Sequence, residues 1–120
     1  MVDIETKRMG HGVAILYLSG SLKGDRLVAF KKEISELIDA GFQSVLVDCR
    51  ELGFVSSSGL ASLLWAKTKA QTKGGSVYFS HVSATVAEVL TVTKLGGLLS
   101  IVPTTREFLE QKGMLRKKPT

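Results

Sequence analysis

Cysteine, proline and histidine are scarce in this chain, which has one cysteine, two prolines and two histidines among its 120 residues. A lone Cys49 excludes an internal disulfide and a cysteine-based metal cluster. Long hydrophobic runs are also missing, because the longest, Val13 to Leu18, falls far short of the roughly 20 residues that span a bilayer. Charged residues between Asp3 and Arg8 exclude a conventional signal peptide. We therefore expect a cytoplasmic protein with no membrane insertion.

Aromatic residues make up only 7% of the chain, and the net charge is +5. Part of the positive excess lies near the C-terminus, in Lys112, Arg116, Lys117 and Lys118. Proteins that bind nucleic acid usually combine a basic face with exposed aromatics or a recognition helix, and neither pattern is present. We expect no direct contact with nucleic acid. We interpret residues 113–120 as a solvated basic tail after a single domain over residues 1–112.

Hydrophobic periodicity predicts strands that alternate with helices. The order is β-β-α-β-α-β-α-β-α, with a Gly10-His11-Gly12 turn between the first two strands. Such alternation is typical of an α/β fold, and we predict a mixed, mostly parallel sheet of four to five strands packed by about four helices. The predicted strands are 4–9, 13–18, 45–48, 77–79 and 101–102, and 19–24 is predicted as a loop.

Four helix starts carry capping signals. Asp25 can cap the first helix, one of the serines at 56–58 the second, and Ser83 the third. The pattern Thr104-x-x-Glu107 is a capping box for the fourth. The apolar faces of the first three helices predict these core residues: Leu27, Phe30, Ile34, Leu37, Ile38, Leu60, Leu63, Val86, Val89, Leu90 and Thr93.

The most informative segment is the hydroxyl-rich loop that contains Ser56, Ser57 and Ser58. It joins a buried strand to an amphipathic helix. A serine at a helix start satisfies a backbone N–H that has no partner within the helix. A helix N-terminus also favours anions. A serine of this loop is therefore either a structural cap or a place where a phosphate would be tolerated.

In this order and spacing, the segments resemble the STAS domain family, the bacterial anti-sigma factor antagonists. The resemblance covers about residues 4–110. It rests on Gly20-Ser21-Leu22, on Val45-Leu46-Val47-Asp48, on the signature Phe54-Val55-Ser56-Ser57-Ser58-Gly59-Leu60, and on Lys73-Gly74-Gly75. The implied fold is STAS-like.

The resemblance implies a protein-binding switch and not an enzyme. In this family an anti-sigma factor that is also a serine kinase phosphorylates a signature serine, which is Ser57 here, with Ser58 a weaker candidate. The unphosphorylated form binds the anti-sigma factor and frees the sigma factor, and a serine phosphatase resets the switch. The implied partner-binding residues are Lys23, Asp25, Ser56, Ser57, Ser58, Gly59 and Leu60. No metal or cofactor is implied.

Two positions depart from the family pattern. Ser56 replaces the acidic residue before the signature serine, and Lys23 replaces the one after Gly20-Ser21-Leu22, although Asp25 lies nearby. These changes leave a second function open, that of a STAS subunit bound to the ATPase of a phospholipid-type membrane transport complex, where phosphorylation is not required. Neither His11 nor His81 has a nucleophile or an acid at motif spacing, so we do not expect catalysis.

Overall fold

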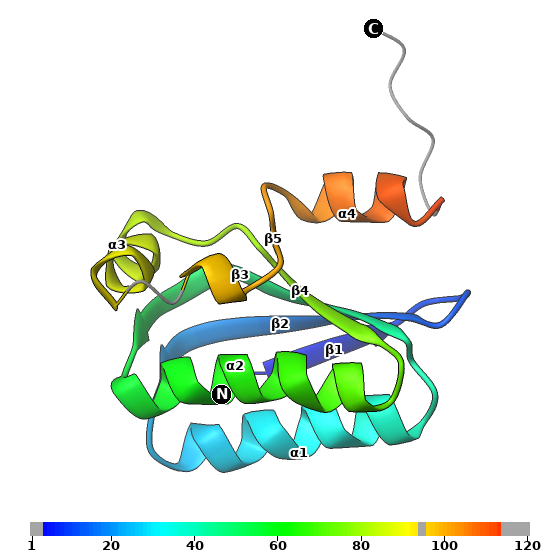
Figure 1. The fold of residues 1–120 in the computed structure, drawn as a ribbon, viewed down its shortest axis with the longest axis horizontal. Helices are drawn as coiled ribbons and strands as arrows, with labels where there is room; N and C mark the ends of the chain where they lie inside the picture. Colours follow the sequence, from blue (N-terminus) through cyan, green and yellow to red (C-terminus); the bar gives the residue numbers. More distant parts are fainter. Residues whose placement is uncertain (1–3, 94–95, 114–120) are drawn as a thin grey trace, which may run out of the picture.

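Five strands form one mixed sheet in the order β1-β2-β3-β4-β5 in a computed structural model that describes residues 4–93 and 96–113 (Figure 1). β1 and β2 are antiparallel, and the remaining neighbours are parallel. The predicted element order is confirmed. The strands are β1 (Ile4–Arg8), β2 (Val13–Leu22), β3 (Ser44–Val55), β4 (Ser76–Ser80) and β5 (Ile101–Val102), and the helices are α1 (Asp25–Asp39), α2 (Ser57–Thr72), α3 (Ala84–Thr93), the 3-10 helix η1 (Gly96–Leu98) and α4 (Thr105–Gln111).

The helices cover the two faces of the sheet unequally. α1 and α2 lie side by side on one face, and α4 lies on the other (Figure 1). Between the sheet and the helix pair lies the main core, to which Leu16, Phe30, Val47 and Leu63 contribute. A smaller cluster lies under α4, where Phe108 packs with residues of β2, β3 and β5, namely Val13, Ile15, Leu46 and Val102.

Most of the predicted core residues are confirmed. Buried ones are Phe30, Ile34, Leu37, Ile38, Leu60, Leu63, Val86 and Leu90. Leu27 and Val89 are partly buried and pack against the main core. The side chain of Thr93 lies outside the described part of the chain, as does the predicted basic tail apart from Gly113.

Two strands are longer than predicted. β2 continues to Leu22 through residues predicted as a loop, and β3 continues past Asp48 to Val55. The prediction failed because the two strands pair with interruptions. Tyr17 pairs with Asp48 but Ser19 pairs with Glu51, and a second shift follows. Such bulges break the alternation of apolar and polar residues on which strand prediction depends.

The helix caps agree with three of the four predictions. Ser83 Oγ accepts a hydrogen bond from Val86 N at 3.3 Å, and Thr104 Oγ1 accepts one from Glu107 N at 3.0 Å. The prediction for α1 was wrong, because the N-cap is Gly24 and makes no side-chain hydrogen bond. Asp25 is instead the first helical residue, where its charge complements the helix dipole.

Candidate functional site

The serine loop is organised by Ser56, which is the N-cap of α2. Its Oγ accepts a hydrogen bond from Gly59 N at 2.9 Å and donates one to the Leu22 carbonyl at 3.3 Å. The backbone N–H of Ser56 donates to the same carbonyl at 3.3 Å. α2 begins at Ser57, so Ser56 is the one of the three serines that supplies the predicted cap. Ser56 stands where the family pattern has an acidic residue, and its hydrogen bonds link the end of β2 to the start of α2.

Gly59 and Leu60 have a packing role in this structure. A Cβ atom on Gly59 would lie 2.3 Å from the Leu22 carbonyl oxygen. Only glycine allows the backbones to approach so closely. Leu60 is 4% exposed and belongs to the main core. Both were predicted as partner-binding residues, and both lie below the surface of the free chain.

Ser57 and Ser58 are exposed in the first turn of α2. This turn contains no acidic residue. The unpaired N–H groups and the dipole of a helix N-terminus favour negative charge. Because Ser56 supplies the cap, neither exposed hydroxyl is needed for that role. The geometry therefore leaves both hydroxyl groups accessible to a modifying enzyme or a partner.

The β2–α1 connection lies beside the serine loop, because Leu22 contacts Ser56 directly. Lys23 is exposed in this connection, and Asp25 is exposed at the start of α1. The Nζ atom of Lys23 lies 5.7 Å from the centroid of the Phe54 ring, which is 47% exposed. This distance is within the range of a cation–π contact. Lys23, Phe54, Ser57 and Ser58 thus form one exposed area, which we call the serine rim.

Phe54 is the member of the serine rim that sequence reasoning missed as a site residue. Its apolar side chain belongs to the signature segment, but Phe54 was not among the predicted partner-binding residues. The strand bulges turn it outward, and periodicity does not reveal such a turn. The available signal was a large aromatic residue next to three serines and a glycine, which is an unusual place for a core residue.

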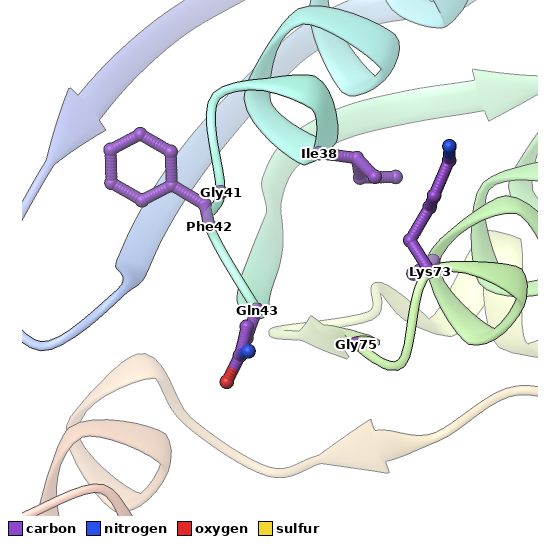
Figure 2. Close-up of a pocket in the computed structure, with 7 residues that line it drawn as sticks. Ile38, Gly41, Phe42, Gln43, Lys73 and Gly75 are labelled. Atoms are coloured by element: carbon purple, nitrogen blue, oxygen red, sulfur yellow. The ribbon is translucent and has the colours of Figure 1, made fainter.

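A hollow of about 100 Å³ lies at the ends of α1 and α2 that are far from the serine loop (Figure 2). In Figure 2 the Lys73 and Ile38 side chains lie across the hollow from the Gly41-to-Gln43 connection, and Phe42 and Gln43 point in different directions. Among its lining residues, Lys73 is the one ionisable side chain. Such a lining offers no nucleophile with a base, so we assign no chemistry to it.

The described residues hold no group of three histidine, cysteine, aspartate or glutamate side chains that could bind a metal ion. Within the same residues, no helix is long and apolar enough to cross a membrane. Cys49 is buried, and burial, with a smaller contribution from Asp48, raises the pKa of its thiol to about 12. A thiol in this state is a poor nucleophile.

Comparison with solved structures gives the fold independently. The anti-sigma factor antagonist SpoIIAA in its unphosphorylated form matches with a TM-score of 0.77 and 18% identity, covering 94% of this chain and 99% of that one. An anti-sigma factor antagonist from Mycobacterium paratuberculosis matches with a TM-score of 0.76 and 19% identity, covering 90% and 92%. A sulfate transporter family protein from Wolinella succinogenes matches with a TM-score of 0.71 and 14% identity, covering 90% of each chain.

Comparison with curated protein sequences gave no significant match. The family model described as "Mlab, STAS domain" matches residues 6–103. This range includes all five strands except the first residues of β1, and it includes the serine rim. The chain belongs to the STAS domain family.

Proposed function

We propose that this chain is an anti-sigma factor antagonist, a cytoplasmic protein without catalytic activity that binds an anti-sigma factor and so frees a sigma factor. The observation that carries the proposal is the serine rim. It joins an exposed Ser57 at a helix N-terminus to an exposed cation and aromatic ring from the neighbouring strand ends. Phe54 keeps a large aromatic ring at the surface beside the Lys23 ammonium group, and aromatic side chains bury much apolar area when a partner covers them.

Phosphorylation of Ser57 is the proposed control. A serine kinase would transfer the terminal phosphoryl group of ATP to Ser57 Oγ, with release of ADP and of the hydroxyl proton. The phosphate adds about −1.5 to −2 charges. The N-terminus of α2 tolerates this charge, so the domain stays folded. A hydrated dianion in the middle of an interface opposes binding, because it must be desolvated. A serine phosphatase would hydrolyse the phosphoserine and restore binding.

The fold is that of anti-sigma factor antagonists, one of which is described in an unphosphorylated form. Ser57 holds the signature position and is exposed. Ser56, in contrast, serves as a structural cap and supplies no carboxylate to a kinase. We infer that binding to the partner is the primary activity and that phosphorylation by a conventional kinase is slow.

The test is the affinity of Ser57→Glu for the anti-sigma factor encoded nearest to this gene, measured by titration calorimetry. A glutamate imitates part of the phosphate's charge, so we expect binding at least about tenfold weaker, or about 1.4 kcal/mol. Gln71→Glu is the matched control, because it adds the same charge at an exposed position of the same helix, outside the serine rim. Wild-type affinity for Ser57→Glu, with an unchanged melting temperature, would remove Ser57 from the interface.

A second candidate function is favoured by one observation. A sulfate transporter family protein has the same fold, and the serine rim lacks the acidic residues of the antagonist pattern. The chain would then bind the ATPase of a phospholipid-type transport complex through the same loops, without phosphorylation. Purification of the chain from its own cells distinguishes the two. An ATPase retained equally by wild type and by Ser57→Ala supports the transporter function.

A further inference from the structure

A second polar site lies on the sheet face that α1 and α2 do not cover. Tyr17 is on the same face of β2 as Val13 and Ile15, which pack under α4. Directly after the Tyr17–Asp48 pair, β3 contains a bulge, because Cys49 and Arg50 together oppose the single residue Leu18. Bulges often lie beside binding sites, where they change the direction of a side chain. This bulge borders a hollow of about 170 Å³ lined by Tyr17, Leu18, Asp48, Arg50 and Glu51, which we call the bulge hollow.

The wall of the bulge hollow contains a buried carboxylate that is held in place. Asp48 is 4% exposed. Its Oδ1 accepts a hydrogen bond from Arg50 N at 2.9 Å, and its Oδ2 accepts one from Thr105 Oγ1 at 2.7 Å. Both donors are uncharged, and a carboxylate has about four lone-pair sites. The Asp48 carboxylate therefore keeps the capacity to accept further hydrogen bonds.

The positive charge of the bulge hollow is Arg50, an exposed residue. Its Nη2 donates a hydrogen bond to His81 Nε2 at 2.8 Å. The same Nε2 accepts a hydrogen bond from Thr105 N at 3.1 Å. His81 Nε2 thus accepts both hydrogen bonds and holds one end of the Arg50 guanidinium. The guanidinium keeps further N–H groups with which to bind a carboxylate.

The Tyr17 hydroxyl adds an uncharged hydrogen-bond donor to the charged side chains that line the bulge hollow. Burial raises the pKa of its phenol, the carboxylates of Asp48 and Glu5 raise it further, and Arg50 lowers it. The hydroxyl therefore stays protonated at neutral pH and can donate a hydrogen bond. It is 37% exposed, so a small molecule can reach it. Glu51, the remaining charged lining residue, is exposed at the edge of the hollow.

We propose that the bulge hollow binds a small zwitterion of the α-amino acid class. The ligand's carboxylate lies against the Arg50 guanidinium and the Tyr17 hydroxyl, and its ammonium group lies against the Asp48 and Glu51 carboxylates. A simple anion is disfavoured by the two acids, and a simple cation by Arg50. At about 30 Å³ per molecule of liquid water, the hollow holds about six waters, which is close to the number of heavy atoms in glycine, alanine or serine.

This site is separate from the serine rim and does not depend on the proposed function. It is coupled to α4, because Thr105, the first residue of α4, contacts both Asp48 and His81. A ligand that holds Asp48 and Arg50 in place stabilises these contacts. We therefore expect bound ligand to slow hydrogen exchange at the amides of α4, including that of Thr105.

The test is a nuclear magnetic resonance titration of the full chain with glycine, L-alanine, L-serine and L-glutamate. Acetate and methylammonium are the probes with a single charge. We expect saturable shifts at the amides of Tyr17, Arg50 and Glu51 for at least one amino acid, with Kd of about 1 mM or tighter. We expect binding at least about tenfold weaker for either single-charge probe.

Variants make the test specific. Arg50→Gln removes the cation from an exposed position and should weaken binding about tenfold or more. Tyr17→Phe should weaken it severalfold. The matched control is Arg106→Gln, which removes an exposed arginine from α4 and should bind like wild type. Three results would each overturn the proposal: no saturable shift for any amino acid up to about 10 mM, equal binding of acetate, or wild-type binding by a folded Arg50→Gln.

Discussion

The Ser56 hydroxyl donates a hydrogen bond of 3.3 Å to the Leu22 carbonyl, across 34 positions of sequence. The same oxygen caps α2. One side chain thus connects the two loops of the serine rim. The family pattern places an acid at this position, and a carboxylate can accept the capping hydrogen bond but cannot donate to a carbonyl. Serine therefore makes a contact that an ionised aspartate cannot make.

This double contact predicts an order of stability for variants at position 56. Ser56→Ala loses the cap and the contact with Leu22, so we expect the free energy of unfolding to fall by about 1–2 kcal/mol. Ser56→Thr retains a hydroxyl and should stay within about 0.5 kcal/mol of wild type. Urea unfolding followed by circular dichroism measures these differences. Ser58→Ala is the control, and a loss there equal to that of Ser56→Ala would contradict the assignment of the cap.

The absence of acidic residues at positions 23 and 56 predicts slow phosphorylation of Ser57. A kinase that uses them to orient the hydroxyl or its metal ion should modify the wild-type chain weakly. Lys23→Asp combined with Ser56→Asp restores both acids and should raise the rate at least about tenfold, or about 1.4 kcal/mol in activation free energy. Incubation with a conventional anti-sigma kinase and ATP, followed by intact mass measurement, decides this. Fast, stoichiometric phosphorylation of the wild type that is abolished by Ser57→Ala would show that the substitutions are harmless.

The Lys23–Phe54 pair should contribute to partner binding but little to folding. Phe54→Ala removes a half-exposed ring, and we expect partner affinity to fall by about 2 kcal/mol, the level of an interface hot spot. Lys23→Gln should have a smaller effect that shrinks at high salt. Ile101 on β5 is exposed to a similar degree, 45% against 47% for Phe54. Equal losses of affinity for Ile101→Ala and Phe54→Ala would argue against the serine rim as the interface.

The raised pKa of Cys49, about 12, predicts a pH dependence of stability. The thiol stays protonated in the folded chain, while the unfolded chain loses this proton from about pH 8.5 upwards. The unfolded state then binds fewer protons, so stability falls as pH rises, by up to about 1.4 kcal/mol per pH unit. Cys49→Ala should lack this contribution. Unfolding free energies of both chains between about pH 8 and 10 measure the difference, and parallel curves would contradict the prediction.

The parts of the fold that follow simple periodicity could be predicted from sequence. α2 and its buried residues Leu60 and Leu63 follow from helical spacing, and Thr104 and Ser83 follow from capping chemistry. The serine rim could be predicted only in part. The exposure of Phe54 and the lengths of β2 and β3 depend on bulges, which arise from pairing between distant residues and leave no local pattern. Sequence alone could not show which of the three adjacent serines caps α2, because the choice of Ser56 depends on its contact with the distant Leu22 carbonyl.

The close approach of Gly59 to the Leu22 carbonyl has a consequence for how this site can evolve. A side chain at position 59 would collide with backbone, whereas the side chains at 57 and 58 point to solvent. Mutation can therefore sample many residues at 57 and 58 while the backbone beneath them keeps one shape. A duplicated copy of this gene could acquire a new partner by changes at those two positions and at Lys23, with little risk to folding. Descendants with different specificities should then share the glycine and differ around it.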